Sequence, residues 1–209
     1  LKNLTFSYTE DKTTLKNISF SIKSGEKVAI IGASGSGKTT ISQLIAGFYA
    51  KNSGDILYND ISIDNISKKS LREHLFLVLQ MPILFNNTLR FNLTMGENIS
   101  NEKIKEALKI AQLNSMLENL PDGLDTIVGK MGIRLSGGQR QRLSIARMIL
   151  ANPSVVIFDE STSALDVQTE TKLFENLENI LKDKTVITIA HRLSTVKNAS
   201  KIFVLEDGE

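Results

Sequence analysis

Cysteine is absent from this sequence of 209 residues, and only 3 prolines occur. Without cysteine the chain forms neither a disulfide nor a thiolate metal site, although this leaves its compartment undecided. No apolar run approaches the roughly 18 residues that cross a bilayer, and no signal sequence opens the chain. With 41% hydrophobic and 23% charged residues, the composition is typical of one sizeable globular domain.

A strong excess of charge is lacking as well, since the formal net charge is +2. This balance gives no reason to expect a nucleic-acid partner or a strongly acidic one. An initiator methionine is also missing: the sequence begins as "LKNLTFSY", inside an expected strand, and stops as "KIFVLEDGE", after an expected strand and turn. We therefore expect residues 1–209 to form a single domain of a longer chain.

Two short stretches near the start alternate between apolar and polar residues, at 4–8 and 18–22. In the second stretch Ile18, Phe20 and Ile22 share one face. This alternation predicts an antiparallel sheet with one buried side.

Continuous apolar runs indicate strands that are covered on both faces. They lie at residues 27–32, 75–80, 154–160 and 185–191. Expected helices separate them, one over residues 39–48 and one around Leu173, Phe174, Leu177 and Ile180. This order predicts an α/β fold with right-handed crossovers and a mostly parallel sheet between helices.

The middle of the chain, from about residue 89 to 120, has a helical pattern. Residues 101–113 place Ile104, Ala107, Leu108 and Ala111 on one face, and Asn101 is a candidate N-cap. We expect an inserted helical subdomain over about 81–151, within a core of residues 1–80 and 152–209.

The stretch "GASGSGKT" at residues 32–39 fits the phosphate-loop pattern G-x-x-x-x-G-K-[ST]. It follows an expected buried strand and opens an expected helix, so its backbone N–H groups can wrap phosphates at the helix N-terminus. Lys38 would neutralise the β- and γ-phosphates, and Thr39 would offer its hydroxyl to Mg²⁺.

Two acidic residues, Asp159 and Glu160, follow four apolar residues at the end of another expected strand. A carboxylate at this position can hold Mg²⁺ through water, and the next one can polarise the attacking water. Either residue alone could simply face solvent. Together with the phosphate loop, the pair predicts a nucleotide hydrolase.

A second glycine-rich turn, "LSGGQ" at residues 135–139, also opens an expected helix. Ser136, Gly137 and Gly138 offer a hydroxyl and N–H donors suited to a γ-phosphate. Since the loop at Lys38 already serves the nucleotide of its own subunit, this turn would close over the nucleotide of another copy. Two nucleotides would then be sandwiched in a head-to-tail dimer.

These motifs resemble, over essentially the whole chain, those of the ATP-binding cassette superfamily of P-loop NTPases. The resemblance implies an antiparallel β subdomain, a parallel core, an inserted helical subdomain, ATP hydrolysis and Mg²⁺. The residues that it assigns to nucleotide binding are Tyr8, Gly32, Ser34, Gly35, Ser36, Gly37, Lys38, Thr39, Thr40, Gln80, Ser136, Gly137, Gly138, Gln139 and Asp166. Those that it assigns to Mg²⁺ are Thr39, Gln80 and Asp159, and those that it assigns to catalysis are Glu160, His191 and Lys38.

Some of these residues have simpler readings when taken alone. Tyr8 could be an edge-strand aromatic, Gln80 a polar strand end, and His191 a hydrogen-bonded histidine. His74 matches no motif and is expected at the surface or in packing, and residues 140–142 are expected on a solvated or packing face of a helix.

Residues 70–93 and 120–139 resemble the exporter branch, in which the cassette follows a transmembrane domain on the same polypeptide. Exporters usually have an acid where "VGKMG" has Lys130. The resemblance implies a second copy as partner, contact with the coupling helices of the membrane domain, no binding of the transported substrate, and a location at the cytoplasmic face of the inner membrane. The alternatives are a non-transport cassette ATPase acting on ribosomes or DNA, and a separate importer subunit.

Overall fold

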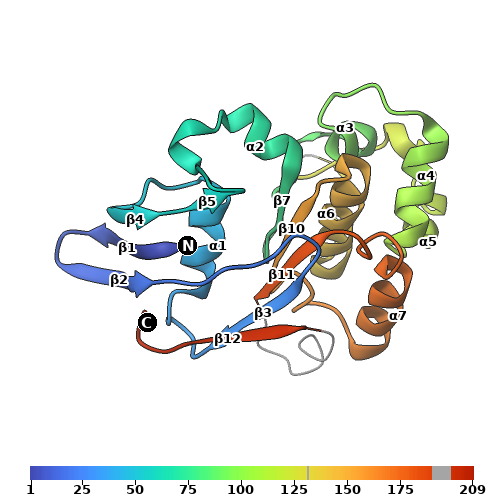
Figure 1. Cartoon of the computed structure of the whole chain (residues 1–209). Coiled ribbons are helices and arrows are strands. Elements are labelled where there is room, and N and C mark those ends of the chain that lie inside the picture. The colour runs from blue at the N-terminus through green and yellow to red at the C-terminus, as the bar shows by residue number, and fades with distance from the viewer. Residues whose placement is uncertain (131, 190–198) are drawn as a thin grey trace. The chain divides into compact units, whose positions relative to one another are not determined.

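The computed structural model describes residues 1–130, 132–189 and 199–209, which form two compact units (Figure 1). Unit 1 comprises Leu1–Leu77, Pro153–Glu160 and Asp183–Glu209. Unit 2 comprises Val78–Asn152 and Ser161–Lys182. Residues 81–151, expected as a helical subdomain, lie in the first segment of unit 2, and residues 161–182, expected in the core, form its second segment.

The central sheet has the strand order β12-β3-β11-β10-β7 among the described residues. Its strands are β3 (Lys27–Gly32), β7 (Leu75–Val78), β10 (Val155–Asp159), β11 (Thr185–Ile189) and β12 (Lys201–Leu205). The pairs β10–β11, β11–β3 and β12–β3 are parallel, as the continuous apolar runs predict. Parallel pairing brings the carboxyl ends of β3 and β10 to one edge, where Gly32 and Asp159 lie.

A smaller antiparallel sheet has the order β2-β1-β4, formed by β1 (Lys2–Thr9), β2 (Lys12–Ile18) and β4 (Ser53–Asp55). The expected strand at 18–22 is wrong, because β2 ends at Ile18 and the turn that joins β1 to β2 is only two residues long. Phe20 and Ile22 still pack against the core of unit 1. The alternating pattern therefore predicted which side chains pack against the core, but not where the strand ends.

Among the described residues of unit 1, the other regular elements are two α-helices, one 3-10 helix and a short hairpin. They are α1 (Lys38–Ile45), β5 (Leu57–Tyr58), β6 (Ile61–Ser62), the 3-10 helix η1 (Ile63–Asn65) and α2 (Lys68–His74). The inner face of α1 carries Ile41 and Leu44, which are fully buried in the hydrophobic core. Since α1 contacts β3, β10 and β11, this packing fixes the phosphate-loop end of the helix at the carboxyl edge of the sheet.

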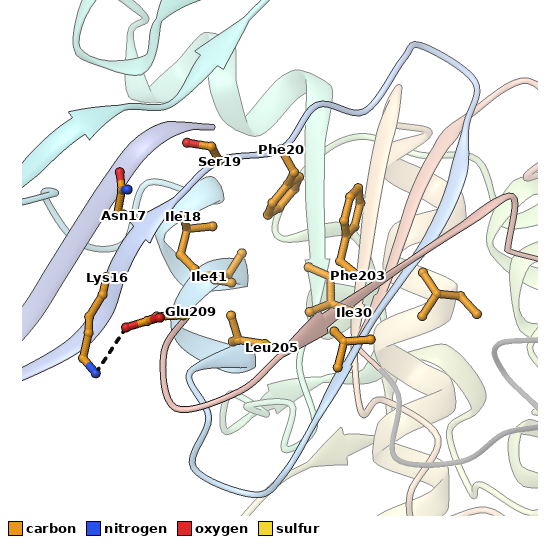
Figure 2. Close-up of a pocket in the computed structure, with 12 residues that line it drawn as sticks. Lys16, Asn17, Ile18, Ser19, Phe20, Ile30, Ile41, Phe203, Leu205 and Glu209 are labelled. Atoms are coloured by element: carbon orange, nitrogen blue, oxygen red, sulfur yellow. Dashed lines mark ion pairs between the residues drawn. The ribbon is translucent and has the colours of Figure 1, made fainter.

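A cavity of about 570 Å³ lies in unit 1 beside β2 and β12 (Figure 2). Its walls are mostly apolar, with Phe20 and Phe203 stacked at a ring distance of 4.4 Å. Lys16 and Glu209 form an ion pair of 3.8 Å at its side. None of the predicted site residues lines this cavity, so its size does not mark the functional site.

Unit 2 is mainly helical among its described residues. Its elements are β8 (Asn87–Thr88), α3 (Leu89–Thr94), α4 (Asn101–Ile110), α5 (Asn114–Glu118), the 3-10 helix η2 (Gly123–Asp125), β9 (Ile127–Val128), α6 (Gly137–Ala151) and α7 (Val167–Leu177). The predicted apolar face of α4 is confirmed, because all four of its members are buried in one cluster. The N-cap of α4 is Ser100 and not Asn101, since the Ser100 hydroxyl accepts from Lys103 N at 3.4 Å. Helix α7 ends at Leu177, so Ile180 lies beyond it.

A buried arginine joins three parts of unit 2. Arg147 on α6 donates to the carbonyl of Ile83 at 2.9 Å, to the carbonyl of Asn92 and, at 3.1 Å, to Asn92 Oδ1. The Asn92 amide in turn donates to the carbonyls of Phe85 and Thr88 at 2.9 Å and 3.0 Å. The Arg147 guanidinium and the Asn92 amide thereby supply hydrogen-bond donors to backbone carbonyls of an otherwise irregular segment.

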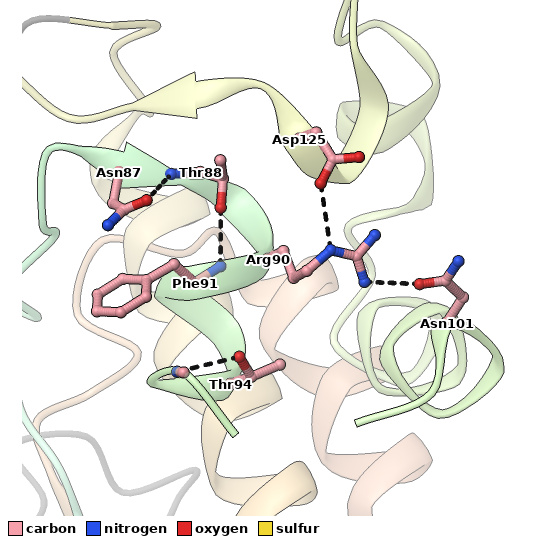
Figure 3. A network of polar contacts seen from close by, with 8 residues as sticks. Asn87, Thr88, Arg90, Phe91, Thr94, Asn101 and Asp125 are labelled. Atoms are coloured by element: carbon pink, nitrogen blue, oxygen red, sulfur yellow. Dashed lines mark hydrogen bonds and ion pairs between the residues drawn. The ribbon is translucent and has the colours of Figure 1, made fainter. Parts of the chain in front are cut away.

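A second arginine of unit 2 lies at the surface (Figure 3). Arg90 donates to Asp125 Oδ1 at 3.2 Å and to Asn101 Oδ1 at 2.6 Å. The Asp125 side chain in this ion pair is 69% exposed. Arg90, like Arg147, donates to more than one acceptor, but its contacts lie at the protein surface.

Over the described ranges, we find no helix with the length and apolar character needed to cross a membrane.

Candidate functional site

The phosphate loop connects the end of β3 to the start of α1. A Cβ on Gly32 would lie 2.2 Å from the Leu205 carbonyl oxygen, so only glycine fits here. Ser34 and Gly35 at the tip of the loop are exposed, whereas Gly37 is buried. The Ser36 hydroxyl is also buried and has no hydrogen-bond partner among the described residues, as expected of a group that serves a ligand.

The Lys38 side chain is buried against the same loop. Its Nζ donates to the carbonyls of Gly32 and Ala33 at 3.0 Å and 2.7 Å. The loop thus holds a positive charge at the N-terminus of α1, where the helix dipole also favours an anion.

Asp159, the last residue of β10, meets two hydroxyls of α1. Thr39 Oγ1 donates to Asp159 Oδ1 at 3.1 Å, and Ser42 Oγ lies 3.1 Å from Asp159 Oδ2. Thr39 and Ser42 are three residues apart and therefore share one face of the helix. The structure thus brings the predicted residues Lys38, Thr39 and Asp159 together within unit 1, and adds Ser42, which the sequence did not single out.

Burial raises the pKa of the Asp159 carboxyl above its ordinary value, and the hydrogen bonds from Ser42 and Thr39 offset this only in part. The side chain is only 2% exposed. An ionised carboxylate at this depth is costly without a counter-charge. The deep burial of the Asp159 carboxylate is therefore consistent with a cation-binding site.

We expect Asp159→Asn to gain stability relative to the unmutated chain as the pH rises above about 4, the ordinary pKa of an aspartate side chain. Because the raised pKa means that the folded state binds this proton more tightly, the stability of the unmutated chain falls as the pH rises from the unfolded to the folded pKa. The asparagine side chain does not ionise, so the variant does not lose stability in this way. Urea unfolding of both proteins, at matched pH without nucleotide or Mg²⁺, measures the difference. A difference that does not change with pH would contradict this account.

Glu160 follows Asp159 with a left-handed backbone, φ 46°, which is unfavourable for a residue with a side chain. Its N–H donates to the Ile189 carbonyl at 3.2 Å, which extends the pairing of β10 with β11 by one residue. The side chain is partly exposed. The strand end therefore turns sharply at this carboxylate.

Tyr8 lies near the end of β1 and is 51% exposed. Its hydroxyl lies 3.1 Å from Thr40 Oγ1 and donates to Gln43 Oε1 at 3.3 Å, which ties the ring to α1. The ring also makes edge contacts with Phe6 and Tyr49, at centroid distances of 4.9 Å and 5.3 Å. Tyr8 is thus a half-exposed aromatic that is anchored to α1, the helix that follows the phosphate loop.

In unit 2, Ser136 is the N-cap of α6. Its hydroxyl accepts from Gln139 N at 3.1 Å, and Ser136 N donates to Gln139 Oε1 at 2.8 Å, which completes a capping box. Gly137 and Gly138 form the first turn, and a Cβ on Gly138 would come within 3.1 Å of Leu165. The predicted donors are therefore present, with the Ser136 N–H held by the chain itself.

Gln141, expected on a solvated or packing face, is only 3% exposed and bridges two segments of unit 2. Its Nε2 donates to the Gln80 carbonyl at 3.0 Å and to Ser163 Oγ at 3.2 Å, while its Oε1 accepts from Ala164 N at 3.0 Å. The Gln80 side chain is exposed. No feature of the sequence distinguishes Gln141 from its solvated neighbours.

The remaining predicted residues divide into three cases. Asp166 is the N-cap of α7, and hydrogen bonds from Thr169 lower the pKa of its carboxyl. His191 lies outside the described residues. His74 is exposed, as expected, and so is Lys130.

A protein-family model described as ABC transporter matches residues 15–163. An ATP-dependent lipid A-core flippase of Syntrophus aciditrophicus (strain SB) is 45% identical over 210 residues, which cover 100% of this chain and 35% of that protein. The uncharacterized ABC transporter ATP-binding protein YwjA of Bacillus subtilis (strain 168) is 45% identical over 205 residues, covering 98% of this chain and 36% of that protein.

A solved structure of a bacterial Atm1-family ABC exporter with ATP bound has a TM-score of 0.93 to this chain, at 39% identity. The match covers 99% of this chain and 36% of that one. The chain thus spans about a third of the length of the relatives that it matches. Because the family model covers more than half of the sequence, the chain belongs to the ABC transporter family.

Proposed function

We propose that this chain is the nucleotide-binding domain of an ABC exporter and that it binds and hydrolyses ATP. The observation that carries the proposal is the cluster of Lys38, Thr39 and Asp159 at the carboxyl edge of the sheet. A buried cation beside backbone N–H groups suits the phosphates of a nucleotide, and a hydroxyl beside a carboxylate suits their metal ion. The exporter relatives support the same conclusion.

We assign a role to each of the predicted residues. Lys38 would release its two loop carbonyls and contact the β- and γ-phosphates, and Ser36 would donate its unpaired hydroxyl. Tyr8 would stack on the adenine. Glu160 would orient the attacking water, and His191 would contact the γ-phosphate.

Mg²⁺ fits the oxygen donors present, because this ion prefers a few protein oxygens together with water and phosphate. Thr39 and Asp159 would hold it, with Gln80 as a further ligand. When bound, it neutralises the charge that develops on the phosphates. Among the described residues no group of three His, Cys, Asp or Glu side chains forms another metal site.

The donors at Ser136, Gly137 and Gly138 would act on the ATP of a second copy of the chain, with Gln139 and Asp166 beside them. The capped N-terminus of α6 offers N–H groups and a positive partial charge to the γ-phosphate. Two copies arranged head to tail would enclose two ATP molecules, and hydrolysis would separate them.

A membrane domain would precede this chain on the same polypeptide and would place it at the cytoplasmic face of the inner membrane. Unit 2 exposes several large apolar side chains: Met81, Ile83, Phe85, Ile127 and Ile133. Exposed apolar side chains of this size support a protein contact, here with the coupling helices. The transported substrate would bind the membrane domain, and nucleic acid would have no role.

The proposal is tested by the oligomeric state of the Glu160→Gln chain, measured by size-exclusion chromatography with light scattering. We expect monomers without nucleotide and dimers with Mg-ATP, because the substitution slows hydrolysis and preserves the closed state. Adding Ser136→Arg should abolish the shift, since a bulky cation replaces the N-cap that faces the partner's phosphate.

Ser115→Arg is the matched control, because it adds the same charge at another exposed serine of unit 2. This variant should still dimerise. A chain that binds Mg-ATP but remains monomeric at all concentrations would contradict the dimer proposed here, and a chain that does not bind ATP would contradict the function.

A further inference from the structure

We propose that Ser42 is a positioning residue for Asp159, and that its hydroxyl orients the carboxylate that holds the metal ion of the nucleotide. This inference rests on the proposed function, in which Thr39 and Asp159 bind Mg²⁺. Ser42 lies outside the phosphate-loop pattern, one turn further along α1.

The geometry is that of a two-point clamp. Thr39 Oγ1 lies 3.1 Å from one carboxylate oxygen of Asp159, and Ser42 Oγ lies 3.1 Å from the other. The Ser42 side chain is fully buried, at 0% exposure, so water does not replace it as a donor. With both oxygens engaged by one helix, the plane of the carboxylate is fixed.

Ser42 has a competing acceptor, because its hydroxyl also lies 2.8 Å from the Thr39 carbonyl oxygen. A serine hydroxyl has one proton and donates to one acceptor at a time. Donation to an ionised carboxylate is about twice as strong as donation to a neutral carbonyl. A carboxylate at Asp159 therefore outcompetes the Thr39 carbonyl for the Ser42 proton.

The contact with Ser42 also determines which carboxylate oxygen of Asp159 stays available to the metal ion. With Oδ2 held by Ser42, Oδ1 remains beside the Thr39 hydroxyl, and the two form a ready pair of oxygen donors. Without Ser42, the carboxylate can rotate and Oδ2 loses a buried partner. Residues that orient a metal ligand in this way typically change metal affinity by about tenfold or more when they are removed.

The test compares the affinity of the chain for a non-hydrolysable ATP analogue in excess Mg²⁺ and in EDTA, by isothermal titration calorimetry. The ratio of the two dissociation constants isolates the contribution of the metal. For Ser42→Ala we expect this ratio to fall about tenfold, with the affinity in EDTA unchanged.

Ile41→Val is the matched control, because it removes one methyl group from the neighbouring buried position of α1 without touching Asp159. It should leave the ratio unchanged. A Ser42→Ala chain that keeps the full ratio, or that loses equal affinity with and without Mg²⁺, would overturn the positioning role while the proposed function stands. If the unmutated chain gains nothing from Mg²⁺, the proposed function fails as well.

Discussion

Glu160→Gln is expected to lower the turnover number for ATP hydrolysis by roughly 10²–10⁴-fold, the usual range for loss of a general base. The substitution preserves the size of the side chain and removes its charge, so the water would lose its acceptor while the phosphate loop is unaffected. ATP binding should therefore remain. Steady-state phosphate release and equilibrium binding, measured on the same protein, separate the two effects.

The backbone at Glu160 gives a second, independent test. A left-handed φ of 46° at a residue with a side chain costs about 1 to 2 kcal/mol, and glycine avoids this cost. Glu160→Gly should therefore be at least as stable as the unmutated chain, yet as inactive as Glu160→Gln. Strained backbone conformations of this kind cluster at functional sites. A Glu160→Gly chain that retains most of the activity would show that the carboxylate is not the base.

Arg147→Met is expected to lower the free energy of unfolding by about 1 to 3 kcal/mol, because the carbonyl of the buried Asn92 is left without its Arg147 donor, whereas Asn92 Oδ1 keeps the Phe85 N–H. The substitution removes the donors to Asn92 Oδ1 and to the carbonyls of Ile83 and Asn92. Burial lowers the pKa of Arg147 to about 10, so its guanidinium is still charged at neutral pH. Urea unfolding followed by circular dichroism measures the loss.

Arg90→Met is the control for this prediction, because Arg90 binds a carboxylate and an amide at the surface of the same unit. Exposed ion pairs contribute about 0 to 1 kcal/mol, so this substitution should change little. Arg147→Lys, which keeps the charge but loses the fork of donors, should be intermediate. Equal losses for Arg147→Met and Arg90→Met would show that burial does not set the value of these contacts.

Continuous apolar runs predicted the strands well, because a strand covered on both faces excludes polar residues along its whole length. The runs at β3, β10 and β11 placed Gly32 and Asp159 at strand ends, and thus at one edge of the sheet. Element boundaries were less predictable. The error at residues 18–22 arose because side chains can continue to alternate in burial after the backbone has left the sheet.

The sequence did not predict contacts between distant segments. Ser42 and Gln141 are ordinary helix residues by pattern, and only the packing of their helices shows that they meet Asp159 and Gln80. The capping box at Ser136 is different, because the spacing S-x-x-Q in the sequence is itself a signal for it. His191 remains a prediction.

Two of the donors proposed for phosphates already have acceptors within the chain. Lys38 donates to loop carbonyls, and Ser136 N donates to Gln139 Oε1. An arriving phosphate would exchange acceptors while the number of hydrogen bonds stays constant. Each exchange gains only the difference between a charged and a neutral acceptor, about 1 kcal/mol. At these two donors binding is readily reversed, because Lys38 and Ser136 N each regain an internal acceptor when the phosphate departs.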